Sequence, residues 1–167
     1  MPITGIEQPE IIQINDTLRL RRFDRAGEDA FRWYQDPETV WLVDGVKEPY
    51  TPEKLDRMYR WLDTHGELYF IEVAEDGAYR AIGDVTLMED NLPIVIGERD
   101  CRGKHLGQQV IAALIRRGRD LGWPRLCVAE IYDFNPASRA CFERAGFRAC
   151  GKTERGHRFV LELDGTD

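Results

Sequence analysis

The feature that most constrains the fold is a strand–loop–helix–strand pattern over residues 92–132. An apolar run, LPIVIG (92–97), leads through a short loop of glycine and cations into RGKHLGQQVIAALIRR (102–117). Apolar side chains spaced by three and four predict one helical face over 106–121, and RLCVAEIY (125–132) predicts a second strand. Such a loop is either a plain turn or an anion site. An anion can bind there because the backbone N–H groups of the first helical turn lack partners within the helix and lie at the positive end of the helix dipole.

The rest of the chain predicts helices and strands in mixed order, with no internal repeat. Pro93 lies near the start of its strand and indicates an edge, a bulge or a place where pairing fails, because proline cannot donate to a ladder. The other expected elements are a strand at 17–23, a helix from Asp24 to about Tyr34, a loop over 36–50, a helix begun by Thr51 and Pro52, a hairpin over 67–87 turning at Asp76-Gly77, a helix from Asn135 to Gly146 and a strand at 157–163.

The size of the chain predicts a single domain over residues 1–167, since 167 residues with 43% hydrophobic content suffice for one core. No apolar stretch approaches the length of a membrane span, so we expect no membrane partner. The start of the chain, MPITGIEQPE, has neither a basic segment nor an apolar one, so we expect no secretory signal and a cytoplasmic location.

Charge and cysteine usage narrow the function classes. The net charge of −7 argues against nucleic-acid binding, which needs a basic face, and permits a cationic substrate. The four cysteines form no Cys-x-x-Cys pair and have no histidine at metal-ligand spacing, so we expect reduced thiols and no metal.

Two common phosphate-binding loops do not fit residues 102–107. The P-loop needs Ser or Thr after Gly-Lys, whereas His105 follows Gly103-Lys104. The dinucleotide fingerprint needs three glycines, and only Gly103 and Gly107 are present, at the wrong spacing.

A third pattern fits. RGKHLG resembles the Gln/Arg-x-x-Gly-x-Gly/Ala loop of the Gcn5-related N-acetyltransferases, the GNAT superfamily. NPASRACFERAGF (135–147) resembles that family's second mark, an Asn followed by a short helix ending in Glu-Lys/Arg-x-Gly-Phe. The marks occur in the family's order, with a helix and a strand between them. The N-terminal part is similar to the aminoglycoside 6′-acetyltransferase and ribosomal-protein acetyltransferase branches.

The resemblance implies an α/β GNAT fold, with a mixed central sheet splayed between strands 92–97 and 125–132 and helices on both faces. It implies direct transfer of an acetyl group from acetyl-CoA, without a metal, to a primary amine. That amine is a small cationic, aminoglycoside-like molecule or a protein N-terminus. We expect a monomer or a homodimer. The alternatives are a catalytically silent acyl-CoA-binding regulatory module and, more simply, an interaction domain without nucleotide affinity.

The resemblance also implies a cofactor site. The pyrophosphate lies on the backbone amides of 103–108, Arg102 and Lys104 add positive charge, and an oxyanion donor lies near Val95 or Ile96. His105 replaces the loop's first glycine, so this histidine is expected to adopt an unusual backbone angle. The implied cofactor-binding residues are Val95, Ile96, Arg102, Gly103, Lys104, His105, Leu106, Gly107, Gln108, Asn135 and Ser138.

Acetyl transfer to an amine needs a group that takes a proton, and four carboxylates are candidates: Asp84, Glu89, Asp90 and Glu130. Glu130 stands beside apolar residues in its strand, so burial is expected to raise its pKa. Surface charge (Glu89, Asp90) or a structural hydrogen bond (Asp84, Glu130) is the simpler explanation for each one alone. We expect at least one of the four to line the acceptor pocket.

The leaving thiolate can take a proton from a general acid. Many relatives have Tyr where this chain has Phe142, and Ser138, one helical turn earlier, is the candidate. Ser138 is equally well explained as a first-turn residue that satisfies helix N–H groups. Cys141 has no nearby histidine and is better explained by packing than as a nucleophile. Several aromatic residues either wall an acceptor cleft or simply pack: Trp33, Tyr34, Trp41, Tyr50 and Trp61.

Overall fold

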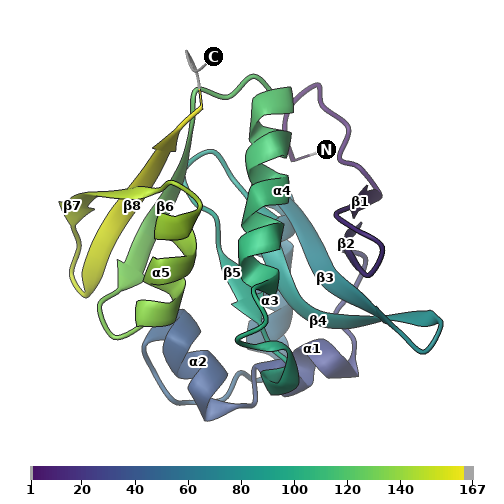
Figure 1. Ribbon diagram of the computed structural model, residues 1–167. Helices are drawn as coiled ribbons and strands as arrows, with labels where there is room; N and C mark the ends of the chain where they lie inside the picture. Colours follow the sequence, from purple (N-terminus) through teal and green to yellow (C-terminus); the bar gives the residue numbers. More distant parts are fainter. Residues whose placement is uncertain (1, 164–167) are drawn as a thin grey trace. The chain divides into compact units, whose positions relative to one another are not determined.

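The computed structural model describes residues 2–163, which divide into two compact units. Unit 1 is the chain up to Thr86 together with Ile94–Lys104, and unit 2 is Leu87–Pro93 together with the chain from His105 on. The expectation of one domain over 1–167 stays a prediction. In chain order (Figure 1) the elements are β1 (Ile11–Gln13), β2 (Leu18–Arg22), α1 (Glu28–Trp33), α2 (Pro37–Asp44), α3 (Pro52–His65), β3 (Glu67–Glu75), β4 (Ala78–Leu87), β5 (Ile94–Ile96), a single 3-10 turn (Arg99–Cys101), α4 (Leu106–Asp120), β6 (Arg125–Tyr132), α5 (Pro136–Arg144), β7 (Arg148–Lys152) and β8 (Gly156–Glu162).

Unit 1 contains a sheet in the order β1-β2-β3-β4-β5, and α3 contacts β3. The β1–β2, β2–β3 and β4–β5 pairs are antiparallel. β5 lies at the edge of this sheet and begins just after Pro93, which confirms the edge strand among the three explanations that the proline indicated. Gly83 lies opposite Ile96, and a Cβ on Gly83 would lie 1.9 Å from the Val95 carbonyl oxygen. The strands therefore approach this closely only because residue 83 is glycine.

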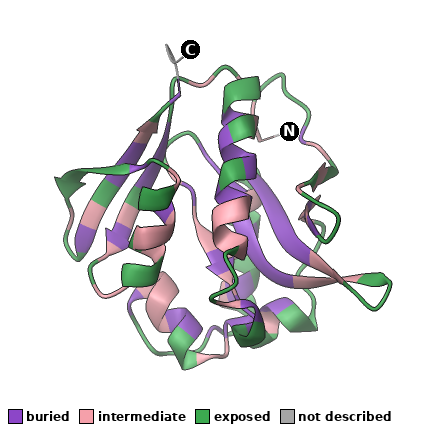
Figure 2. Cartoon of the chain, in the orientation of Figure 1, coloured by how far each residue is buried: buried purple, intermediate pink, exposed green. Residues whose placement is uncertain are grey.

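The β3–β4 hairpin turns at Asp76-Gly77, as the sequence predicted. Both residues have positive φ angles, 52° and 80°. A two-residue turn with left-handed backbone at both positions matches the twist of the flanking strands. Figure 2 shows that β3 and β4 are buried along much of their length and become exposed towards this turn.

Unit 2 contains a sheet in the order β6-β8-β7, with both pairs antiparallel. α4 contacts α5 and β6. Gly118 on α4 brings that helix close to Leu126 and Leu163, since a Cβ there would lie 3.1 Å from each side chain. The register shifts between Val128 and Ile131, which marks an irregularity in β6. β5 and β6 belong to different sheets, as expected for strands that do not pair along their length.

Two predicted boundaries were wrong. Residues 36–50 are not all loop, because α2 occupies 37–44: Asp36 caps it, Pro37 takes its first position and Gly45 ends it in the left-handed conformation. The first helix begins at Glu28 and not after Asp24. The Asp24 carboxylate instead accepts from the Arg25 backbone N–H and pairs with the Arg21 guanidinium at 3.2 Å.

Candidate functional site

The entrance of α4 has the geometry expected of an anion site. His105, the residue before the helix, has φ 62° and its side chain makes no capping hydrogen bond, and the first turn contains no acidic residue. By contrast, α2, α3 and α5 each have a side-chain cap. The capping side chains of Asp36, Thr51 and Asn135 accept a hydrogen bond from a backbone N–H in the first turn of their helix. The predicted unusual backbone angle of His105 is confirmed. The first-turn amides of α4 are thus not satisfied by the side chain of their own cap, and no nearby carboxylate in that turn would repel an anion.

The division between the units falls between Lys104 and His105. The predicted cofactor residues are therefore divided between the two units. Unit 1 contains Val95, Ile96 and 102–104, and unit 2 contains 105–108, Asn135 and Ser138. The cofactor site as a whole stays a prediction.

Arg102 has a different setting from the one expected. Its Nε donates to the Ile96 carbonyl at 3.0 Å, and its Nη2 donates to Thr39 Oγ1 at 2.7 Å. A weaker ion pair joins it to Glu38 at 3.6 Å. The guanidinium is thus used to join β5 to α2, while Lys104, two residues on, is exposed.

Asp84 lies at the centre of a buried polar cluster in unit 1. The residue is 2% exposed and pairs across the strands with Val95. The hydroxyls of Tyr34 and Tyr59 each donate to Asp84 Oδ2 at 2.8 Å. Burial raises the Asp84 pKa to about 6, against the opposing effect of the two hydroxyls, which favour the ionised form. A carboxyl with a pKa near neutrality is well suited to accept and release a proton.

The other candidate bases have different environments. Glu130 accepts from the Thr153 hydroxyl and, at 3.0 Å, from the Arg155 backbone N–H. These hydrogen bonds lower its pKa, so the expectation that burial raises it was wrong. Glu89 and Asp90 are exposed and follow β4, next to Asn91, whose side chain accepts from the backbone N–H of Leu92 and of Ala129.

The α5 helix of unit 2 contains the second family mark. Asn135 Oδ1 accepts from the Ser138 backbone N–H at 3.2 Å, so these two residues meet in a cap. Phe142 is 2% exposed and packs edge to face on Phe147, with ring centroids 5.1 Å apart. Burial raises the pKa of the Cys141 thiol, which disfavours the thiolate and agrees with a packing role.

The candidate aromatic residues are divided between core and surface. Trp33, Tyr34 and Tyr50 are buried, Trp41 is half-buried, and Trp61 is 52% exposed and stacks on His65 with ring centroids 4.0 Å apart. In the described structure, the first three therefore serve mainly as core.

Some residues that support these groups had no role predicted from the sequence. Tyr59 lies in the helix expected to begin at Thr51 and Pro52, and Thr39 lies in the segment expected to be a loop. Glu98 is 8% exposed and accepts from the Trp33 indole N–H at 2.6 Å and from Arg32 at 2.7 Å. These contacts join residues more than 60 positions apart, and nothing in the local sequence predicts them.

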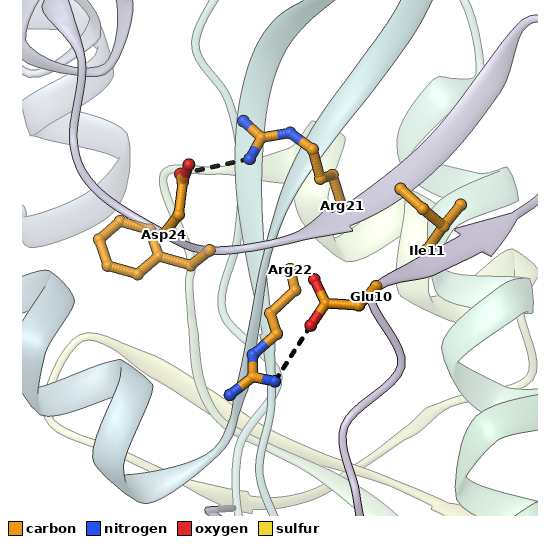
Figure 3. A pocket seen from close by; sticks show the side chains of 6 residues that line it. Glu10, Ile11, Arg21, Arg22 and Asp24 are labelled. Atoms are coloured by element: carbon orange, nitrogen blue, oxygen red, sulfur yellow. Dashed lines mark hydrogen bonds and ion pairs between the residues drawn. The ribbon is translucent and has the colours of Figure 1, made fainter.

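A surface hollow lies elsewhere in unit 1, along β1 and β2 (Figure 3). Arg21 pairs there with Asp24 at 3.2 Å, and Arg22 with Glu10 at 3.3 Å. None of the predicted site residues lines it. The candidate residues are therefore the α4 entrance within unit 2 and Asp84 within unit 1, and none of them lies in this hollow.

Among the described residues, 2–163, no group of three or more histidine, cysteine, aspartate or glutamate residues is placed to hold a metal ion. None of the helices in that range is long and apolar enough to cross a membrane.

Comparisons with known proteins give the family. Residues 17–148 match the family model described as an acetyltransferase (GNAT) domain. Over 125 residues the chain is 35% identical to the L-methionine sulfoximine/L-methionine sulfone acetyltransferase of Pseudomonas aeruginosa PAO1, covering 68% of this chain and 72% of that protein.

Solved structures share the fold at lower identity. A domain from Methanocaldococcus jannaschii DSM 2661 has a TM-score of 0.76 at 22% identity, covering 89% of this chain and 100% of that one. The microcin C7 self-immunity acetyltransferase MccE, in complex with acetyl-CoA and AMP, has a TM-score of 0.73 at 16% identity, covering 93% and 96%. The aminoglycoside acetyltransferase AAC(6')-Ib, in complex with paromomycin and acetyl-CoA, has a TM-score of 0.69 at 15% identity, covering 88% and 94%.

Proposed function

We propose, from the premise that this chain belongs to the acetyltransferase (GNAT) family, that it acetylates the primary amine of a small molecule. As a member of that family it is an acetyl-CoA-dependent N-acetyltransferase, and acetyl-CoA is its co-substrate. The single observation that carries the assignment of the site is the uncapped, acid-free first turn of α4 after the RGKHLG loop.

That first turn fits the pyrophosphate of acetyl-CoA. The backbone N–H groups of 106–108 are the donors, and the helix dipole favours the negative charge. Gly103, in the left-handed conformation at φ 74°, has no atom within 4 Å of the place where a Cβ would stand. Gly103 and Lys104 are both exposed, and Lys104 carries a positive charge close to the first turn of α4 in the chain.

The chemistry needs few protein groups. When acetyl-CoA is bound, its thioester supplies the acetyl group. The neutral amine attacks the carbonyl carbon, an N–C bond forms, the C–S bond breaks and the thiolate leaves. The amine loses one proton, and we propose Asp84 as the carboxylate that accepts it, because its pKa of about 6 keeps it mostly ionised at neutral pH and near its titration point.

Small amino acids are the first acceptors to test. The 35%-identical relative is named for acetylating L-methionine sulfoximine and L-methionine sulfone, which carry a primary amine next to a carboxylate. Aminoglycoside-like amines and protein N-termini stay as further proposals. The net charge of −7 supports the cationic acceptors, because a negatively charged protein attracts cations.

A panel of amines tests this proposal. The release of free thiol from acetyl-CoA is followed with three classes of acceptor: polar amino acids, aminoglycosides and peptides with a free N-terminus. Fully N-acetylated versions of each acceptor are the controls. We expect turnover with at least one primary amine and none with its blocked form. Tight acetyl-CoA binding without turnover on any amine would favour the silent acyl-CoA-binding module.

A further inference from the structure

The segment that leads from β5 to α4 is held in unit 1 by charged side chains. Arg99 donates to both carboxylate oxygens of Asp36, at 2.7 and 2.6 Å, and Asp36 also caps α2. Glu98, one residue earlier, accepts from the Trp33 indole and the Arg32 guanidinium. Gly97 permits this, because a Cβ there would come within 2.2 Å of the Trp33 ring. Residues 97–99 are therefore fixed to α1 and α2.

Arg102 is the last of these attachments before the loop turns into α4. One arm of its guanidinium donates to the Ile96 backbone carbonyl at the end of β5, and another donates to the Thr39 hydroxyl on α2. Thr39 is 1% exposed and the Arg102 side chain is 25% exposed, so this hydrogen bond is partly buried. A planar guanidinium reaches both acceptors at once, whereas the single ammonium of a lysine would not.

We infer that Arg102 is a positioning residue that clamps α2 to the end of β5, and that this clamp, rather than a direct contact with phosphate, is its contribution to acetyl-CoA binding. The inference rests on the proposed function. Only Gly103, Lys104 and His105 separate Arg102 from α4, so the direction in which the chain leaves Arg102 constrains the short loop that immediately precedes the proposed phosphate-binding amides of 106–108. A buried threonine of α2 then influences cofactor affinity without touching the cofactor.

The two roles of Arg102 predict different patterns among variants. A direct phosphate contact needs a positive charge at position 102 and is indifferent to Thr39. The clamp needs the guanidinium fork and the hydroxyl together. In the clamp, Arg102→Lys loses affinity although it keeps the charge, and Thr39→Val loses affinity although it is nearly isosteric.

A double-mutant cycle measured by titration calorimetry with CoA tests the inference. We expect the Kd for CoA to rise about tenfold in Arg102→Gln, about fivefold in Thr39→Val, and no more than about tenfold in the double variant, because both changes remove one interaction. Arg102→Lys is expected to resemble Arg102→Gln.

Matched controls lie on α3. Arg60 pairs with Asp56 on the surface, and Thr64 bonds back to the carbonyl of Arg60 in its own helix. Arg60→Gln and Thr64→Val are expected to leave the Kd for CoA unchanged, and thermal unfolding with acetyl-CoA absent compares the folding of all variants.

The outcomes separate the inference from the proposed function. CoA binding by the wild type, with the non-additive losses above, supports both. An unchanged Kd in Thr39→Val, or wild-type affinity in Arg102→Lys, overturns the clamp while leaving the acetyltransferase intact. Failure of the wild type to bind CoA overturns both. If Arg102→Gln does not fold, Thr39→Val and Arg102→Lys still decide the question.

Discussion

Asp84 combines deep burial with two hydrogen-bond donors that favour its charge. Its pKa rises from 3.8 to about 6, so the folded chain holds this proton more tightly than the unfolded chain does. The stabilisation from the protonated form is complete below 3.8 and is lost as pH rises through about 6. Between those values we expect the free energy of unfolding of the wild type to fall relative to that of Asp84→Asn, by up to roughly 3 kcal/mol for about two pKa units.

Chemical denaturation of the two proteins across this pH range measures the difference. Asp16→Asn, which changes an exposed aspartate, is the matched control and should follow the wild type. Parallel curves for the wild type and Asp84→Asn would show that Asp84 titrates alike in the folded and unfolded chains.

The tyrosine hydroxyls should tune the reaction through Asp84. Removing one donor in Tyr59→Phe weakens support for the ionised carboxylate, so the Asp84 pKa should rise further, by about one unit. The acidic limb of the kcat/KM profile should then move to higher pH, because the base works in its ionised form. The acceptor's own titration is the same for both enzymes and cancels in the comparison. An unmoved limb would assign that limb to another group.

Single residues were predicted with mixed success. Asp84 was a candidate from its place in an apolar strand, but its donors Tyr34 and Tyr59 come from two helices that no local pattern connects to β4. For Glu130 the apolar neighbours suggested a raised pKa, whereas the Thr153 hydroxyl and the Arg155 N–H lower it. Local sequence reports which side chains are near in the chain, but not the long-range hydrogen bonds that set a pKa.

At the scale of elements, α4 is the part to which we assign cofactor binding in the proposed function. A side chain at Gly107, in its first turn, would stand between the backbone amides and a phosphate. Gly107→Val should therefore weaken CoA binding at least tenfold, about 1.4 kcal/mol. Gly151→Val on exposed β7, where a Cβ meets no atom within 4 Å, is the control and should keep wild-type affinity. Titration with CoA measures the affinity of both variants. If Gly107→Val binds CoA as tightly as Gly151→Val does, the α4 entrance is not the site.

The elements were more predictable where periodicity and caps agreed. The helix expected at 106–121 is α4 at 106–120, and the caps at Thr51 and Asn135 are as expected. α2 was missed although Asp36-Pro37 is the same kind of start as Thr51-Pro52, because its short length and surrounding turn residues masked that signal. Short helices depend on their tertiary contacts more than on their own periodicity.

At the scale of the whole molecule, two motifs in the right order gave the family, and the family match over 17–148 confirms it. A glycine in the left-handed conformation (Gly103) and an asparagine cap (Asn135) leave a local trace in the sequence, which is why the two family motifs could be found there. The acceptor leaves no such trace. Relatives are named for different amines, methionine sulfoximine in one case and aminoglycosides in another, so the family alone does not give the acceptor.

The most direct test of the account is the stoichiometry of the reaction with the acceptor that the amine panel selects. Mass spectrometry follows the acceptor, the CoA released and the intact protein in one reaction. We predict one N-acetyl group on the amine for each CoA released, no acetylated protein as an intermediate, and loss of both products when the amine is blocked. CoA release without an acetylated amine, or an acetyl group that stays on the protein, would contradict direct transfer to a primary amine.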